Sequence, residues 1–244
     1  MNRPELNFLL AAALCWPGLS LSGDFIKVGD FSAQQAGNGL PAGWKLLPLA
    51  DKKPTRFILV ESEGQVVVRA EADQAVAALM HEVRADAKHY SVLRWRWKVE
   101  NLLKNSNIHT KHGDDYPARV YVMFDYDINK LPWFERVKLK FARMLYGENL
   151  PLAALCYVWD SHAPAGTVVD NAYTDRIKMI VVESGAAKLQ KWVDEERNIF
   201  EDFRAAFGEE PPLLIGIAIA VDTDNTKESA VSYFGDISLH AVAD

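Results

Sequence analysis

The stretch "SVLRWRWKVE", residues 91–100, alternates apolar and charged side chains from Leu93 onward. Because successive side chains of a β-strand point to opposite faces, this alternation predicts a strand with one buried and one solvated face. The buried set is Leu93, Trp95, Trp97 and Val99, and the solvated set is Arg94, Arg96, Lys98 and Glu100. Burial of two indole rings is strongly favourable, so we interpret both tryptophans as core residues rather than as ligand platforms.

Further segments are short, rich in β-branched or aromatic residues, and bounded by Gly, Pro, Asp or Asn. They are residues 56–62, 65–72, 77–84, 118–127, 153–161, 176–184, 213–224 and 230–239. Many short strands without intervening helical repeats predict an all-β, mainly antiparallel fold. We expect a jelly-roll β-sandwich with two short peripheral helices.

Two segments have helical patterns. Residues 132–146 start with a proline and carry an apolar stripe beside a basic face, which predicts a helical insertion near 130–150 that caps the sandwich. Contact of the basic face with a membrane surface is an alternative to simple solvation. Residues 194–207 predict the second helix, with Asp194 as its N-cap and acidic residues in its first turn, where the helix dipole favours them.

The N-terminal residues 1–22 have a polar start, an apolar run too short to span a bilayer, and small residues near their end. We expect a signal peptide, a periplasmic or secreted protein, and residues 23–244 as one domain without a transmembrane segment. Removal of the signal leaves Cys156 alone, so no internal disulfide is expected. The formal net charge of −6 argues against a nucleic-acid partner.

The side chains of the predicted strand at 118–127 also divide between two faces, with Arg119 and Tyr121 on the face opposite to the apolar set. If it neighbours the strand at 91–100, one cationic, tyrosine-bearing face results, which could hold an acidic polysaccharide through charge-assisted hydrogen bonds. The alternative is that these cations pair with acidic side chains nearby.

In the predicted strand at 153–161, alternation places Tyr157 and Trp159 on one face and Cys156 on the other. We interpret Cys156 as a small apolar residue that fills space rather than as a nucleophile.

Carboxylates gather in three predicted loops, at 114–115, at 195–196 and at 222–226. Hydrolysis or elimination on a sugar chain uses two ionisable groups across the scissile bond, for which Asp115 and Glu196 are candidates with Arg119 steadying the charge. The loop "DTDNT" offers oxygen ligands that suit calcium, although Asx-type turns use the same residues. His109 and His112 lack further ligands for zinc, and the common nucleophile-elbow, phosphate-loop and H-E-x-x-H motifs are absent from the sequence.

Several stretches together resemble a bacterial family known as domain of unknown function 3047, over nearly the whole chain after the signal. They are "LRWRWKV" (93–99), "GDDYPARVYV" (113–122), "YVWDS" (157–161), "WVDEERNIFEDFRAAFG" (192–208), "PPLLIGIAIAVDTDNT" (211–226) and "YFGDISL" (233–239). This family name implies no activity. The opening "GDFSAQQAGNGLPAGW" (29–44) and the closing "FGDISL" (234–239) are also similar to the first and last strands of galactose-binding-like jelly rolls, common among carbohydrate-binding modules.

In several such modules a structural calcium ties the chain ends together. The resemblance implies Asp236 as a ligand here, with Asp24 or Asp30 near it, and no other cofactor is expected. The candidate metal ligands are Asp222, Asp224 and Asp236.

The leading hypothesis is non-catalytic binding of a carbohydrate or cell-envelope polymer. The candidate ligand-binding residues are Asp114, Asp115, Arg119, Tyr157, Trp159, Trp192, Arg197 and Asp222. The alternatives are a polysaccharide lyase or glycoside hydrolase using the carboxylate pair, and a structural or assembly protein in which Asp114, Asp115 and Arg119 form a closed ion-pair network.

Overall fold

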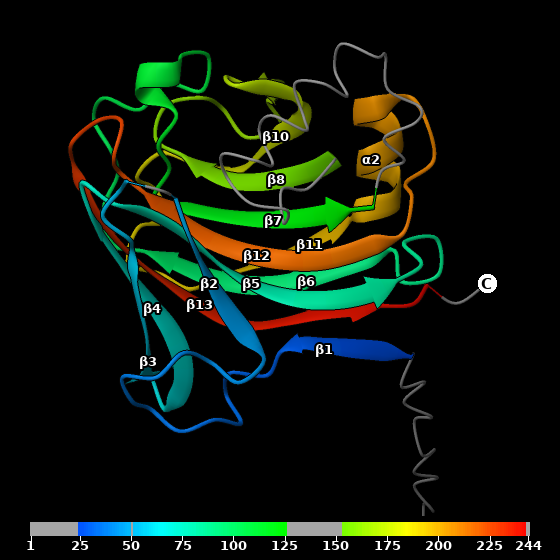
Figure 1. Cartoon of the computed structure of the whole chain (residues 1–244), viewed down its shortest axis with the longest axis horizontal. Coiled ribbons are helices and arrows are strands. Elements are labelled where there is room, and N and C mark those ends of the chain that lie inside the picture. Colours follow the sequence, from blue (N-terminus) through cyan, green and yellow to red (C-terminus); the bar gives the residue numbers. More distant parts are fainter. Residues whose placement is uncertain (1–23, 50, 126–152, 243–244) are drawn as a thin grey trace, which may run out of the picture.

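The computed structural model describes residues 24–49, 51–125 and 153–242. They form two β-sheets packed face to face (Figure 1). Sheet A has the order β11 (Val193–Asn198), β6 (Val92–Val99), β13 (Ser229–His240), β4 (Gln65–Asp73), β3 (Arg56–Ser62), and β1 (Phe25–Gly29) also pairs with β13. Sheet B has the order β2 (Trp44–Pro48), β5 (Val76–Ala85), β12 (Leu214–Asp222), β7 (Ala118–Phe124), β8 (Ala153–Asp160), β10 (Thr174–Ser184), β9 (Val168–Asn171).

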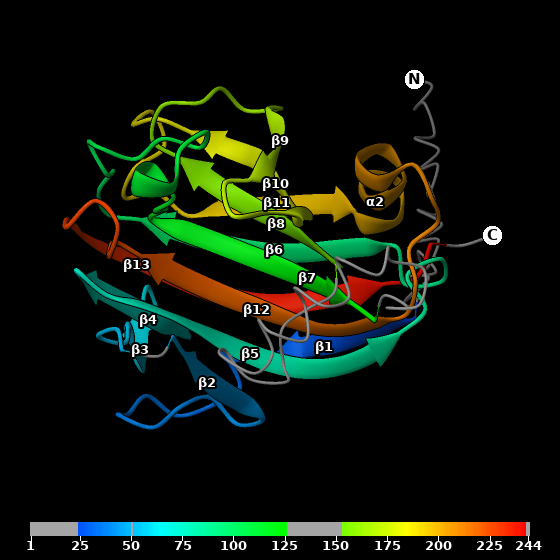
Figure 2. The ribbon, with the colours of Figure 1, turned by 45° about the horizontal axis from the view of Figure 1, so that its top comes forward.

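The predicted jelly-roll β-sandwich is confirmed. Consecutive strands alternate between the sheets, from β4 through β7 and again from β10 through β13, so each layer is assembled from distant parts of the chain (Figure 2). Among the described strands, only the pairing of β8 with β10 is parallel. The first and last strands, β1 and β13, pair antiparallel. The predicted signal (1–22) and the predicted helical insertion near 130–150 lie outside the described residues.

The core between the sheets contains the apolar set of β6, as its alternation predicts. Trp97 is fully buried and Trp95 is 3% exposed. Trp95 stacks on Tyr157 of β8 with ring centroids 5.3 Å apart, and Trp97 packs against Trp159 at 6.1 Å. These contacts join sheet A to sheet B through aromatic rings, which bury large apolar areas.

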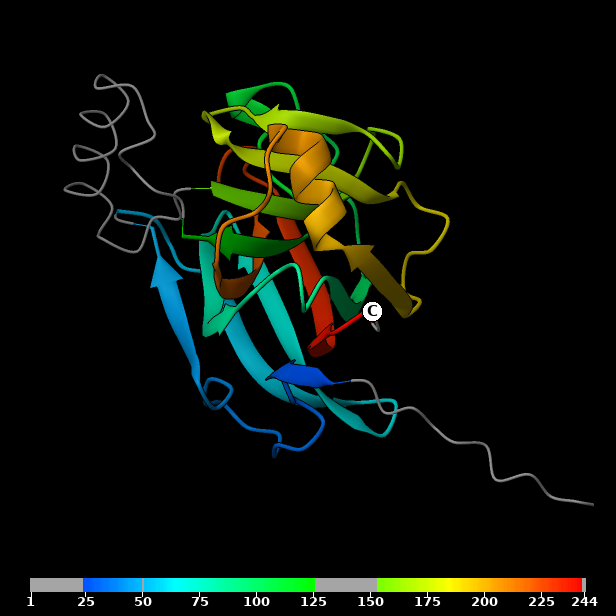
Figure 3. The ribbon, with the colours of Figure 1, turned by 90° about the vertical axis from the view of Figure 1, so that its right-hand side faces the viewer.

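The predicted helix at 194–207 is too long at its N-terminal end. The helix α2 is Ile199–Phe207, beside β8 and β11 at one edge of the sandwich (Figure 3), and Phe203 packs on Phe124 of sheet B. Residues 193–198 form β11 instead, paired antiparallel with β6. Without β11, one edge of β6 would expose unpaired backbone groups, so tertiary hydrogen bonding overrides the local helical pattern. The N-cap is Asn198 rather than Asp194.

The condition for one shared cationic face, that the strands at 91–100 and 118–127 are neighbours, is not met. β6 lies in sheet A, whereas β7 lies in sheet B between β12 and β8. The cations of β6 therefore share no face with Arg119 and Tyr121, which belong to β7.

Among the described strands, four were not predicted: β1, β2, β9 and β11. The first three have four or five residues each, too few for a clear alternation. Within the described residues, no helix is long and apolar enough to cross a membrane. A short 3-10 helix, η1 (Lys111–Gly113), precedes β7.

We predict that Asn198→Ala lowers the free energy of unfolding by about 1 kcal/mol, because its side chain accepts a hydrogen bond from the Glu201 amide at the start of α2. Asp194→Ala is the control and should change stability by no more than about 0.5 kcal/mol, since Asp194 is exposed on β11. Urea unfolding of both variants measures the difference. Equal losses would show that the helix begins earlier than in this structure.

Candidate functional site

Carboxylates from two loops meet at one end of sheet B. Because β7 and β12 are antiparallel neighbours, the residues before β7 lie beside those at the end of β12. Oxygen atoms of Asp115, Asp222 and Asp224 consequently lie within 4.8 Å of one another. All three residues are buried, as is Asp114. We call these four residues the aspartate cluster.

Arg119 compensates the negative charge of this cluster. Its side chain is 3% exposed, contrary to the expected position on a solvated face, because that face of sheet B is covered here. Its Nε donates to Asp222 Oδ1 at 2.7 Å, and its Nη2 contacts the other oxygen of that carboxylate. Nη2 also donates to the main-chain oxygen of Asp114 at 2.6 Å, and Nη1 donates to the Tyr121 hydroxyl at 3.1 Å. The guanidinium is thus held on several sides by the protein itself.

The adjacent carboxylates at 114 and 115 tie separate loops to the start of β7. Asp115 is fully buried and accepts hydrogen bonds from the main-chain amides of Asn225, at 3.2 Å, and Thr226, at 2.6 Å. The two carboxylate oxygens of Asp114 accept hydrogen bonds from the side-chain amide of Asn171, with Nδ2 3.2 Å from Oδ1 and 3.1 Å from Oδ2. Burial raises the pKa of Asp114, while the charge of Arg119 acts in the opposite direction. The cluster therefore has the closed geometry expected of a structural network.

A calcium ion does not fit this cluster well. The Arg119 guanidinium already bonds to Asp222, and the Lys52 ammonium lies 2.9 Å from Asp224. A divalent cation placed beside two cations would be repelled. The third predicted metal ligand, Asp236, lies in sheet A, where it accepts hydrogen bonds from Ser32. The first and last described strands are thus joined by the pairing of β1 with β13, and the contact of Ser32 with Asp236 lies beside it.

We predict that Arg119→Ala lowers the free energy of unfolding by about 3–5 kcal/mol, because it leaves buried carboxylates without their counter-charge. Arg94→Ala is the control, since Arg94 forms an ion pair while 52% exposed and should cost no more than about 1 kcal/mol. Urea unfolding at pH 7 measures both. Similar losses for the two variants would contradict a structural role for the network.

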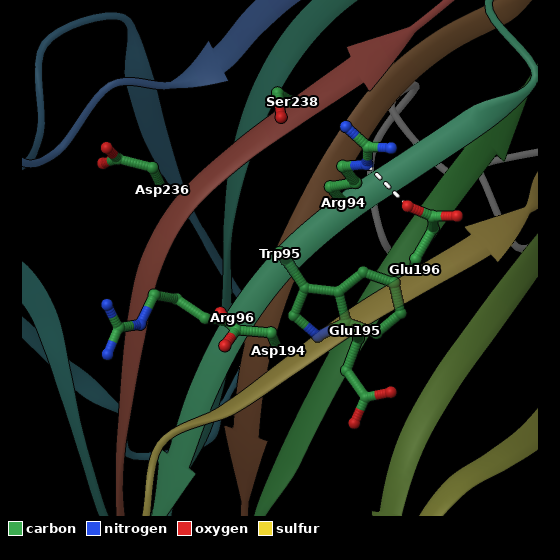
Figure 4. Close-up of a pocket in the computed structure, with 8 residues that line it drawn as sticks. All are labelled: Arg94, Trp95, Arg96, Asp194, Glu195, Glu196, Asp236 and Ser238. Atoms are coloured by element: carbon green, nitrogen blue, oxygen red, sulfur yellow. Dashed lines mark hydrogen bonds and ion pairs between the residues drawn. The ribbon is translucent and has the colours of Figure 1, made fainter. Parts of the chain in front are cut away.

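A second group of polar side chains surrounds a hollow of about 350 Å³ on the outer face of sheet A, the face turned away from sheet B (Figure 4). It is lined by Arg94, Trp95, Arg96, Asp194, Glu195, Glu196, Asp236 and Ser238. We call it the sheet A groove. The register of β11 against β6 builds it: Glu196 lies opposite Arg94, and Asp194 lies opposite Arg96. A register shift in β13 between Phe234 and Ile237 accompanies the outward position of Asp236.

Arg96 is held in an extended position across β13, as Figure 4 shows. A Cβ atom on Gly235 would lie 2.4 Å from Arg96 Cγ, so the side chain crosses β13 where no other residue type leaves room. Its guanidinium carbon sits 4.2 Å from the centre of the Trp192 ring, and Nη1 donates to the Gln65 side chain at 3.2 Å. Lys98 lies 4.7 Å from the centre of the Tyr233 ring. Cation–ring contacts thus hold these two cations of β6, and Arg96 is the one of them that lines the groove.

On its other side the groove has an ion pair and an unpaired acid. Arg94 Nε donates to Glu196 Oε2 at 2.6 Å. Because Arg96 leans toward β13, Asp194 makes no hydrogen bond or ion pair with any residue that the structure describes. Trp95 and Glu195 lie between these pairs, with side chains directed to the inner face, so they contribute to the floor.

Glu195 has an unusual environment. Alternation turns its carboxyl toward the core, where Trp97 Nε1 donates to Oε1 at 3.2 Å. Burial, followed by the nearby Glu183 carboxylate, raises the pKa of Glu195 to about 7, although the Trp97 hydrogen bond and the charges of Lys188 and Arg197 act to lower it. Glu195 therefore changes its charge near neutral pH.

We predict that wild-type protein loses stability relative to Glu195→Gln as the pH rises from about 5 to about 8. The folded state holds the Glu195 proton more tightly than the unfolded state, in which the pKa of this carboxyl is near 4.5. The stabilisation that comes from this proton is therefore complete below pH 4.5 and is lost as the pH rises from 4.5 to about 7. The change in relative free energy of unfolding should be roughly 1–3 kcal/mol. Denaturant unfolding of both proteins across this pH range measures it, and a constant difference would contradict the raised pKa.

The other predicted site residues are placed as follows. Tyr157 and Trp159, two of the candidate ligand-binding residues, are fully buried in the core and so cannot contact a ligand, because β8 is covered on both faces. Arg197 pairs with Asp202 of α2 at 2.6 Å. The proposed catalytic pair is not brought together: Asp115 is buried in the aspartate cluster, and Glu196 is paired with Arg94 on sheet A.

Sequence reasoning missed several residues that the structure brings into use, notably Asp194, Gly235 and Ser238 at the groove and Asn171 and Asn225 at the cluster. The stretch 193–198 contains one apolar residue, Val193, so it offered no alternation that would have indicated a strand, and the helical interpretation placed Asp194 at an N-cap. The role of Gly235 had no sequence signal, because it depends on a side chain from another strand.

A family model described as "Protein of unknown function (DUF3047)" matches residues 42–238, which include both the aspartate cluster and the sheet A groove. The chain belongs to this family. The resemblance found in the sequence is therefore confirmed, and the family description adds no activity. No protein with a curated description matches the chain.

Solved structures with some similarity include carbohydrate-active proteins. The family 30 carbohydrate-binding module of a Clostridium thermocellum cellulosomal cellulase has 11% identity and a TM-score of 0.39, over 90% of this chain and 99% of that chain. The Endo-D glycoside hydrolase domain from Streptococcus pneumoniae R6 has 9% identity and a TM-score of 0.37, over 82% of this chain but only 22% of that chain. A mutant of ENZbleach xylanase has 8% identity and a TM-score of 0.34, over 83% and 84% of the two chains. These values do not assign an activity to this chain.

Proposed function

We propose that this protein is an exported, non-catalytic binding protein for a carbohydrate or cell-envelope polymer, and that the sheet A groove is its binding site. The observation that carries this proposal is the arrangement of Arg96, held on Trp192 and Gln65, beside an open hollow that contains the unpaired carboxylate of Asp194. The N-terminal segment 1–22, with its short apolar run, supports export to the periplasm or beyond.

The groove has the groups that sugar hydroxyls need. Carboxylates accept hydrogen bonds from hydroxyls, guanidinium groups donate to them, and charge-assisted bonds of this kind are stronger than neutral ones. Trp192 contributes indirectly, because its ring holds the guanidinium of Arg96, which lines the groove. Because Arg96 is clamped by Gly235, Trp192 and Gln65, little of its side-chain freedom is left to lose on binding.

Binding is favoured over hydrolysis or elimination by the position of the carboxylates. Glu195, the acid near the groove whose pKa is raised, faces the core and Trp97 rather than the open groove. Glu196 is held by Arg94 at 2.6 Å. Glycoside hydrolysis requires two carboxyl groups that face each other across the scissile bond of the substrate. Glu195 and Glu196 do not form such a pair.

We predict that residues 23–244 bind at least one glycan of a bacterial-envelope array, and that Trp192→Ala and Arg96→Ala each weaken binding by about tenfold, or about 1.4 kcal/mol. Arg56→Ala is the matched control, because Arg56 is an exposed arginine of sheet A that pairs with Glu71 away from the groove. Glycan-array screening followed by titration calorimetry measures binding. The proposal fails if no glycan binds, or if all three variants bind as the wild type does.

A further inference from the structure

The charges around the sheet A groove constrain its ligand. The outward side chains that line it comprise two cations, Arg94 and Arg96, and three carboxylates, Asp194, Glu196 and Asp236. The difference, two minus three, is one net negative charge. Glu195 is not counted, because its carboxyl faces the core and Trp97. The protein as a whole also has a formal charge of −6. A polyanion approaching this face would therefore meet no positive field.

The cations of β6 are already used within the protein. Arg94 bonds to Glu196 at 2.6 Å, and Lys98, with its side chain 12% exposed, has Glu63 at 3.5 Å and Glu100 at 4.0 Å. Arg96 has its charge against the Trp192 ring and donates to Gln65. An anionic sugar would have to displace these partners, whereas a hydroxyl can share them.

The unused capacity of the groove consists mainly of acceptors. Asp194 has no partner among the residues that the structure describes, and both its oxygens are available. Asp236 accepts two hydrogen bonds from Ser32, but a carboxylate has about four acceptor positions. Acceptors of this kind match hydroxyl or amide donors and repel carboxylate, sulfate or phosphate groups.

We propose that the ligand of the sheet A groove is an uncharged, hydroxyl-rich glycan and not an acidic polysaccharide. This inference rests on the proposed function and names its ligand class. It reverses the expectation drawn from the cationic alternation of β6, because the acids that neutralise that row are contributed by β11 and β13. Neutral sugar residues can lie in the groove while their hydroxyls bond to Asp194, Asp236 and the free guanidinium hydrogens of Arg94.

The test compares binding of residues 23–244 to two sets of hexasaccharides by titration calorimetry. The neutral set is made of glucose, mannose, galactose or N-acetylglucosamine, and the acidic set of galacturonate or mannuronate. We expect a neutral hexasaccharide to bind at least tenfold more tightly than every acidic one. We also expect its affinity to change less than about twofold between 20 and 300 mM salt, because no charge pairing drives binding.

The variant Asp194→Lys changes the lining from one net negative to one net positive charge. This variant should bind the neutral hexasaccharides more weakly than the wild type, and it should bind the acidic hexasaccharides measurably and in a salt-sensitive way. Glu61→Lys is the matched control, because Glu61 is an exposed acid on β3 of the same sheet, away from the groove, and it should change neither. Far-ultraviolet circular dichroism checks that both variants are folded.

The outcomes separate the two proposals. If an acidic hexasaccharide binds the wild type as tightly as the neutral ones or more tightly, with affinity that falls at high salt, the inference is overturned while glycan binding stands. If neither set binds, the proposed function itself is overturned. Neutral binding that Trp192→Ala and Asp194→Lys leave unchanged would overturn the assignment of the groove.

Discussion

Burial of the two β6 tryptophans between the sheets is the constraint on which the rest of the structure depends. Trp95 stacks on Tyr157 and Trp97 packs on Trp159, so β6 cannot turn over without exposing both indole rings. A shift of one residue in its register would move every side chain to the other face. The same contacts therefore hold Arg94 and Arg96 on the outer face, where the groove forms.

The two charged groups of residues differ in what they leave available. In the aspartate cluster the carboxylates and the arginine are buried, and they bond to one another, to loop amides and to neighbouring side chains such as Lys52 and Tyr121. Such a network orders the ends of β7 and β12, and breaking it is costly because charge would be left in a low-dielectric interior. In the sheet A groove, all three outward acids and part of each cation stay exposed, so of these two groups only the groove can exchange water for a ligand.

The edge strand β11 links fold and function. It satisfies the open edge of β6 and, by the same register, places Asp194 and Glu196 beside the arginines. Its alternation also turns Glu195 toward the core, which costs the carboxyl its hydration and raises its pKa to about 7. The groove acids Asp194 and Glu196 and the desolvated core acid Glu195 are thus all placed by the same pairing of β11 with β6.

The sequence by itself determined which side chains of a strand share a face, because a period of two is a local property: the burial of Trp95 and Trp97, and the opposite faces of Tyr157 and Cys156, were predictable. Family membership was likewise readable from the residues. Only the tertiary structure decided which strands are neighbours, because the hydrogen-bonding edges of a strand are alike for every partner. That choice separated Arg119 from Arg96, made 193–198 a strand instead of a helix, and brought Asp115 to Asp222 across more than a hundred residues of chain.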